Sequence, residues 1–267
     1  MPSRPTVRDC VTLLERLAPP DLDEAWDNTG LLFGHPSAPV SSVTTCLTLT
    51  ADVADEAIAR GDGLIVSHHP VLFRPVQRLT ADDPQAATLL KLAAASIAVF
   101  SPHCRWDNTA GGINDRLGTR FGLHRMRPLR VRPELAGKIP RGSGRIGVRE
   151  QASPFDEFVR EVKQAMNLES VAAVPTDRVV RTVGVACGSA GEYLQDAIRA
   201  GCDAFVTGET SFHTALEART AGIGLLLIGH YVSERFSLEE LAEELNDYFP
   251  DVPIRASDAE RDPLIQL

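Results

Sequence analysis

The sequence predicts an α/β protein made of two related units, each built on a mainly parallel sheet. Two observations lead to this class: short apolar strand-like segments alternate with helical segments, and the same order of elements occurs twice. Residues 57–61 align with 197–201, and each segment contains Ala-Ile and ends in glycine. At the same offset 64–67 lies on 204–207. The alternative is a chance likeness between two generic β-α-β segments.

The first unit begins with a helix, because apolar residues recur at helical spacing from Val7 to Leu17 and two prolines follow. Branched apolar runs then predict buried strands, and capping residues mark the helices between them. Either Asp82 or Asp83 is the expected cap of the third helix. The expected elements are a helix over 7–17, a strand over 43–49, a helix over 52–60, a strand over 63–67, a helix over 84–95 and a strand over 97–100.

The second unit repeats this alternation after a segment of different composition that starts near residue 125. We expect a metal-binding α/β domain formed by 1–124 with 229–267, which holds all five candidate metal ligands, and a second α/β domain formed by 125–228. The expected elements are strands over 145–148, 183–186, 204–207 and 223–228, and helices over 155–166, 193–200, 212–220 and 238–245.

Composition excludes several classes of protein. The 267 residues carry a net charge of −9, so general nucleic-acid binding is not expected. Five scattered cysteines without a C-x-x-C pair fit a reduced, cytoplasmic location. No signal core or apolar run of membrane-spanning length is visible, and we expect no membrane partner.

A basic stretch interrupts this acidic chain between Arg120 and Arg149, where Glu134 is the single acid. Such a stretch usually forms solvated surface. The alternative is a rim that attracts a small phosphorylated ligand or nucleotide. Its cations are Arg120, Arg125, Arg127, Arg130, Arg132, Lys138, Arg141, Arg145 and Arg149.

Adjacent histidines, His68 and His69, follow an apolar strand and precede Pro70. Neighbouring side chains within a strand point to opposite faces, but a chain that turns out of the strand can bring both rings to one cleft. That edge is where open α/β sheets bind ligands. The pair therefore indicates a metal site, although one histidine could instead be a core or capping residue.

Two further strands are also followed by potential ligands. His230 and Glu234 are four residues apart, so they share one face if the segment is helical. His103 and Asp107 have the same spacing. The alternatives are an ordinary solvated pair at 230 and 234, and a helix cap at Asp107. A dinucleotide-type glycine pattern at 142–147 lacks the strand-to-helix context and is set aside.

Together these motifs resemble the Nif-three-like dinuclear-metal proteins, also described as GTP cyclohydrolase I type 2-like. The resemblance covers essentially the whole chain, with one departure at Cys104, where threonine is common. The residues that carry it are Trp26-Asp27-Asn28-Thr29-Gly30-Leu31, Ser67-His68-His69-Pro70, His103 with Asp107, Gly111-Gly112-Ile113-Asn114-Asp115, Thr207-Gly208-Glu209, His213, Gly229-His230-Tyr231 and Ser233-Glu234-Arg235.

The resemblance implies that the C-terminal segment closes the first domain and that the chain forms a toroidal homohexamer. It also implies two divalent ions per chain. Imidazole and carboxylate ligands suit Zn, Mn, Fe, Co or Ni. The implied ligands are His68, His69, Asp107, His230 and Glu234.

Five side chains cannot fill two coordination spheres, and open positions are typical of catalytic metals. We therefore expect a metal-dependent hydrolase, and the resemblance suggests GTP as substrate and formate with dihydroneopterin triphosphate as products. Glu209, His103 and His213 are the candidate proton-transfer residues. The alternatives are a non-enzymatic metal-handling or regulatory scaffold and, less favoured, a metal-dependent phosphoesterase.

Overall fold

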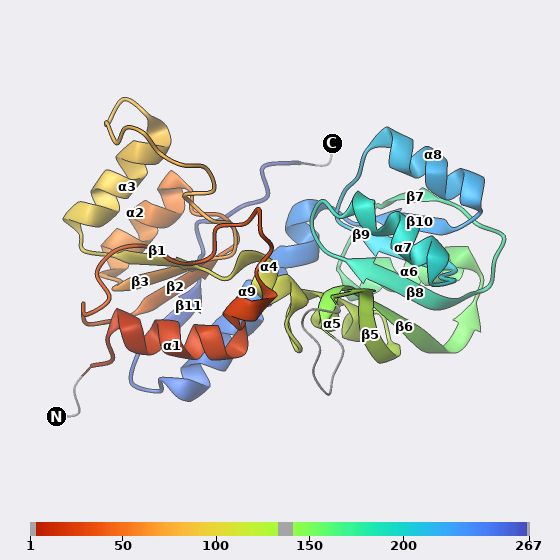
Figure 1. Cartoon of the computed structure of the whole chain (residues 1–267), viewed down its shortest axis with the longest axis horizontal. Coiled ribbons are helices and arrows are strands. Elements are labelled where there is room, and N and C mark those ends of the chain that lie inside the picture. Colours follow the sequence, from red (N-terminus) through yellow and green to blue (C-terminus); the bar gives the residue numbers. More distant parts are fainter. Residues whose placement is uncertain (1–3, 133–140, 266–267) are drawn as a thin grey trace. The chain divides into compact units, whose positions relative to one another are not determined.

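The protein is described by a computed structural model that covers residues 4–132 and 141–265. It divides into two compact units, Met1–Trp106 with Arg235–Leu267, and Asp107–Glu234 (Figure 1). The chain passes between them within helix α4 (His103–Asn108) and within helix α9 (His230–Tyr248). The sequence placed these boundaries near 124 and 229 instead. Lys138 and Glu134 of the basic stretch lie outside the described residues.

The first unit contains a five-stranded sheet in the order β1-β4-β3-β2-β11. Every neighbouring pair is parallel except β1 with β4 at one edge. The C-terminal β11 pairs with β2, so the C-terminal segment does complete this sheet. The strands are β1 (Gly30–Phe33), β2 (Val43–Cys46), β3 (Leu64–Ser67), β4 (Ala98–Ser101) and β11 (Ile254–Ala256).

Helices cover both faces of this sheet: α2 (Ala51–Arg60) and α3 (Pro84–Ala94) on one, α1 (Val7–Leu17) on the other (Figure 1). Asp83, rather than Asp82, caps α3, because its carboxylate accepts the backbone N–H of Ala86. The core is formed by apolar side chains of the strands, α2 and α3. Its fully buried members include Ile65, Val99, Leu92 and Val53.

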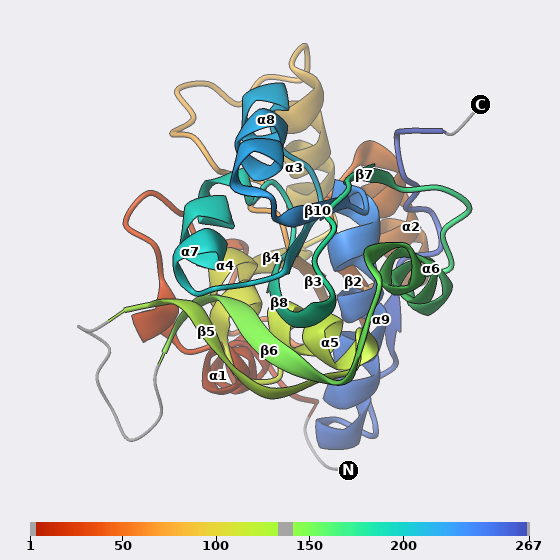
Figure 2. The same cartoon turned by 90° about the vertical axis from the view of Figure 1, so that its right-hand side faces the viewer.

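The second unit contains a six-stranded sheet in the order β5-β6-β8-β9-β10-β7. Its centre, β8 to β10, is parallel, while β5, β6 and β7 are antiparallel additions. Helices α7 and α8 lie on one side and α6 on the other (Figure 2). The elements are α5 (Ile113–Arg120), β5 (Leu123–Val131), β6 (Gly142–Ser153), α6 (Phe155–Ala165), β7 (Ala172–Val174), β8 (Val180–Ala186), α7 (Leu194–Arg199), β9 (Ala204–Thr207), α8 (Phe212–Ala221) and β10 (Gly224–Leu227).

The repeat seen in the sequence is also a repeat of structure. Val43 pairs with Leu64 in the first sheet, and at the corresponding positions Val183 pairs with Ala204 in the second. The α/β class with two sheets is therefore confirmed. Residues 142–147 lie inside β6, which agrees with setting the dinucleotide pattern aside. Within the described residues, no helix has both the length and the hydropathy needed to cross a membrane.

Candidate metal centre

Three imidazoles converge in the first unit. His68 and His69 follow β3, and their backbone N–H groups donate to the carbonyls of Cys46 and Leu47 at 2.9 and 2.8 Å. His103 begins α4. One nitrogen from each of the three rings lies within 4.8 Å of the others, and His68 is fully buried. The chain does turn after His68, so the adjacent histidines share one site and can hold a metal ion.

Hydrogen bonds fix the orientation of two of these rings. The Asp27 carboxylate accepts from His103 Nδ1 at 2.7 Å, and the Thr48 hydroxyl lies 2.8 Å from His69 Nδ1. Burial favours a high pKa for Asp27, but its hydrogen bonds with His103, Cys104 and Asn28 and the charge of His103 outweigh it and lower the pKa to about 2. An ionised carboxylate only accepts, so Nδ1 of His103 carries the proton and Nε2 is the ligand or base.

Cys104, the departure from the family pattern, takes part in this arrangement through its backbone. Its N–H donates to Asp27 at 3.3 Å, and its thiol accepts from the backbone N–H of Glu24 at 3.4 Å. The backbone of His103 has a φ of +28°, a conformation that is strained for a non-glycine residue. Strain of this kind is concentrated at functional sites.

Two exposed aromatic side chains lie beside His103. The ring of Trp26 is centred 6.0 Å from the His103 ring, and that of Phe73 is 6.4 Å away. The two aromatic rings also pack edge to face with each other. Trp26 is 62% exposed and Phe73 46%, so both present faces to solvent next to the imidazoles.

The second unit holds a different set of potential metal ligands, at the start of α9. His230 and Glu234 are one turn apart, and His230 Nε2 lies 3.1 Å from Glu234 Oε2. On its other side His230 Nδ1 lies 3.0 Å from the exposed carboxylate of Glu209. The hydrogen bond to Glu234, opposed by burial and supported by the Glu209 carboxylate, raises the pKa of His230 to about 9. The segment is helical, as the shared-face interpretation required.

Asp107 lies within α4, where a buried thiol contacts it. Cys187 Sγ is 3.2 Å from Asp107 Oδ1, and the backbone N–H of Cys187 donates to Asn114. Burial and the charges of Asp107 and Glu234 raise the pKa of Cys187 well above its usual value, so the thiol is neutral and donates. The capping interpretation of Asp107 is wrong, because α5 has Gly112 at its N-cap without a side-chain cap.

Two glycines make room for these groups. At Gly188, which has a φ of +64°, a Cβ atom would collide with Glu234 Oε1. At Gly208 a Cβ would lie 2.6 Å from the carbonyl oxygen of Gly188 and 2.7 Å from Ser233 Oγ. Ser233 Oγ in turn accepts from the N–H of Gly188 at 3.0 Å. Glycine at position 188 therefore lets the loop before Tyr193 pack directly against the Glu234 carboxylate.

His213 is the candidate that the structure leaves apart. It is an exposed residue of α8, and its ring contact is with Phe212 at 6.0 Å. Among the described residues of its unit, no hydrogen bond or ion pair joins it to His230 or Glu209. The sequence did not indicate roles for Thr48, Phe73 and Cys187, because nothing in their local pattern distinguishes them from ordinary strand-end and loop residues.

Comparison with known proteins identifies the family. Residues 5–263 match the model of the Duf34/NIF3 (NGG1p interacting factor 3) family. The chain is 33% identical to a NIF3 homolog of Schizosaccharomyces pombe, with 96% of each chain covered. It is 30% identical to a Helicobacter pylori protein named GTP cyclohydrolase 1 type 2, over 91% of this chain and 92% of the relative.

The fold comparison agrees with this. A Staphylococcus aureus hypothetical protein superimposes with a TM-score of 0.89 at 26% identity, covering 99% of this chain and 100% of the other. Both the sequence match and the fold match extend over nearly the whole chain, so neither rests on one domain alone. The chain belongs to the Duf34/NIF3 family.

Proposed function

We propose that the chain is a metal-dependent hydrolase with a dinuclear centre. The observation that carries this is the convergence of the His68 and His69 imidazoles after β3, with an imidazole nitrogen of His103 within 4.8 Å of both as a neighbouring proton-transfer group. A second ligand set, His230 with Glu234, begins α9, and Asp107 follows His103 by one turn of α4. We propose that both sets are metal ligands of this chain.

The donor chemistry fits a pair of divalent first-row ions. Imidazole and carboxylate groups suit Zn, Mn, Fe, Co or Ni and do not choose among them. Five such side chains leave coordination positions open for water and substrate. When bound, a metal pair supplies Lewis acidity and lowers the pKa of water. The proposed ligands are His68, His69, Asp107, His230 and Glu234.

The chain's own residues would move protons around this centre. Asp27 holds Nδ1 of His103 protonated, so Nε2 of His103 is available to accept a proton from water and return it to a leaving group. Glu209, half-exposed beside His230, is a second acceptor on the other unit. His213, the third candidate, has its ring contact with Phe212, and among the described residues the structure gives it no contact with Glu209 or His230.

GTP is the substrate suggested by relatives that are named GTP cyclohydrolase 1 type 2. The proposed overall reaction converts GTP and one water into formate and dihydroneopterin triphosphate. The exposed faces of Trp26 and Phe73 support a planar ring in the substrate, since stacking on aromatic side chains would hold such a ring next to His103.

Formate release from GTP by metal-reconstituted protein tests the proposal. His68→Ala should abolish release, whereas His35→Ala, which removes an imidazole outside the centre, should not. No release at full metal occupancy would exclude GTP cyclohydrolysis and favour the metal-handling scaffold. Phosphate release in place of formate would identify a phosphoesterase.

We also propose that the chain forms a homohexamer. Light scattering should then give a mass of six chains, and a monomer would contradict this proposal.

A further inference from the structure

The basic stretch divides into two kinds of arginine in the second unit. Some are neutralised by carboxylates and hold the fold together: Arg130 pairs with Asp196, Arg145 with Asp115 and Arg149 with Glu161. Arg125 is different, and so is Arg181 of the neighbouring β8. Among the residues that the structure describes, neither has an ion-pair partner. Their charge is therefore not used for stabilising this unit.

These two arginines line one hollow. It has a volume of about 430 Å³ and is lined by His124, Arg125, Val148, Arg149, Glu150 and Arg181. The lining residues come from the adjacent strands β5, β6 and β8. Because Arg149 is paired with Glu161, two guanidinium groups without an ion-pair partner among the described residues, Arg125 and Arg181, share this hollow with the single carboxylate of Glu150. Such a surplus of fixed positive charge attracts anions.

The backbone at Arg125 is strained. Its φ is +52°, and it lies in the irregularity where β5 loses register with β6 between His124 and Arg127. Left-handed backbone is unusual for a residue with a long side chain. Bulges of this kind redirect a side chain, and strain is retained where a function requires it. The bulge therefore gives a reason for Arg125 to point into the hollow.

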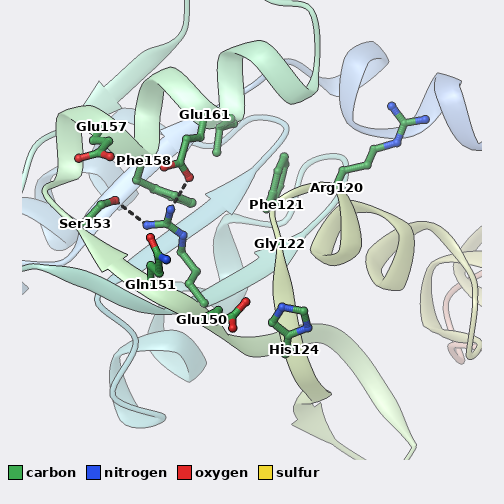
Figure 3. Close-up of a pocket in the computed structure, with 12 residues that line it drawn as sticks. Arg120, Phe121, Gly122, His124, Glu150, Gln151, Ser153, Glu157, Phe158 and Glu161 are labelled. Atoms are coloured by element: carbon green, nitrogen blue, oxygen red, sulfur yellow. Dashed lines mark hydrogen bonds and ion pairs between the residues drawn. The ribbon is translucent and has the colours of Figure 1, made fainter.

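A second hollow continues the first. It has a volume of about 390 Å³ and shares His124, Arg149 and Glu150 with the other. Phe121, Phe158 and Val162 lie buried beneath it, and the Arg149 guanidinium stacks on the Phe158 ring at 5.1 Å. Figure 3 shows His124 and Glu150 on the strand side, Phe158 and Glu161 on the helix side, and Arg120 pointing away from them.

The two hollows, which share His124, Arg149 and Glu150, together form a groove. We propose that this groove binds a small organic phosphate. Arg125 and Arg181 would bind the phosphate group, and the organic portion would extend into the second hollow, beside the Arg149 guanidinium. Guanidinium groups are well suited to phosphate oxygens. Glu150, Glu157 and Glu161 along the same groove oppose a nucleic-acid backbone, which would present a row of negative charges. None of the groove residues is a proposed metal ligand, so variants can test the groove and the proposed centre independently.

Binding of inorganic phosphate and of phenyl phosphate at constant ionic strength tests the groove directly. Each guanidinium should contribute about tenfold in affinity, so Arg125→Gly and Arg181→Ala should each weaken binding by about that factor. Phenyl phosphate should bind more tightly than phosphate alone. Arg127→Ala is the matched control, because it removes the same charge from β5 but does not line the hollow.

Two further measurements distinguish phosphate binding in the groove from a loss of fold and from binding at the metal centre. Arg125→Gly should melt no lower than wild type, because glycine relieves the positive φ; lost binding in that variant is then not a loss of fold. His68→Ala should bind phosphate as wild type does. Absence of saturable binding, equal weakening by Arg127→Ala, or dependence on His68 would each overturn the proposal, whatever the outcome of the formate assay.

Discussion

The two units place different chemistry at the same point of one repeated structure. In the first, His68 and His69 directly follow β3. The corresponding residues after β9 are Gly208 and Glu209, and a side chain at Gly208 would meet the Gly188 carbonyl and the Ser233 hydroxyl. The second unit instead presents its imidazole and carboxylate from α9. The two units therefore share the same strand register, while the candidate ligands of the second lie on α9, the helix that follows β10.

The largest expected effect comes from the helix-borne ligand of the second unit. Glu234→Ala should remove at least one metal per chain while the protein remains folded, because one coordinating carboxylate is lost from the proposed centre. Metal content by plasma mass spectrometry and circular dichroism measure the two properties. Glu239→Ala on the exposed face of α9 is the control. Retention of both metals in Glu234→Ala would show that Glu234 is not a ligand.

The close packing around Gly208, after β9, can be tested by measuring the stability of a variant. Gly208→Ala should lower the free energy of unfolding by about 1–3 kcal/mol, because the new methyl group would overlap the backbone of Gly188. Gly63→Ala, which would meet the backbone of Val40, should have a similar effect in the first unit. Urea denaturation measures both. If Gly208→Ala were as stable as wild type, the loop that contains Gly188 would have to move to admit the methyl group. Steric exclusion would then not explain why position 208 has no histidine.

The contact between Cys187 and Asp107 has no counterpart in the first unit, where Leu47 occupies the equivalent position. Loss of a group that orients a metal ligand typically weakens metal binding about 10–100-fold. We expect Cys187→Ala to lie near the lower end and Cys187→Ser to retain more affinity, since a hydroxyl also donates. Competition with a chromophoric chelator measures this. The buried Cys202→Ala serves as control, and equal affinity in all variants would exclude a positioning role.

The sequence could predict features that have a local signal, but not contacts between residues that are far apart in the chain. The strand ends and the repeat were visible because apolar runs and glycines are local signals. The start of α9 was missed: the sequence indicated a helix from 238, whereas it begins at His230. The first turns of α9 contain the polar residues His230, Ser233 and Glu234, which interrupt the apolar pattern that would predict a helix. Asp27 and Cys187 reach their partners across 76 and 80 residues, so no local pattern could reveal those contacts.

The smallest effect concerns the charge of His230 in metal-free protein. Glu234, opposed by burial, raises the pKa of His230 to about 9 from a usual value of 6.5. The stabilising contribution is complete below the unfolded-state pKa and is lost as the pH rises through about 9. In the presence of chelator, wild type should therefore lose stability relative to His230→Gln between about pH 6 and about pH 10. If stability depended on pH in the same way in both proteins, His230 and Glu234 would not pair without metal. The candidate ligands of the second unit would then not be held in place before metal binds, unlike the hydrogen-bonded imidazoles of the first unit.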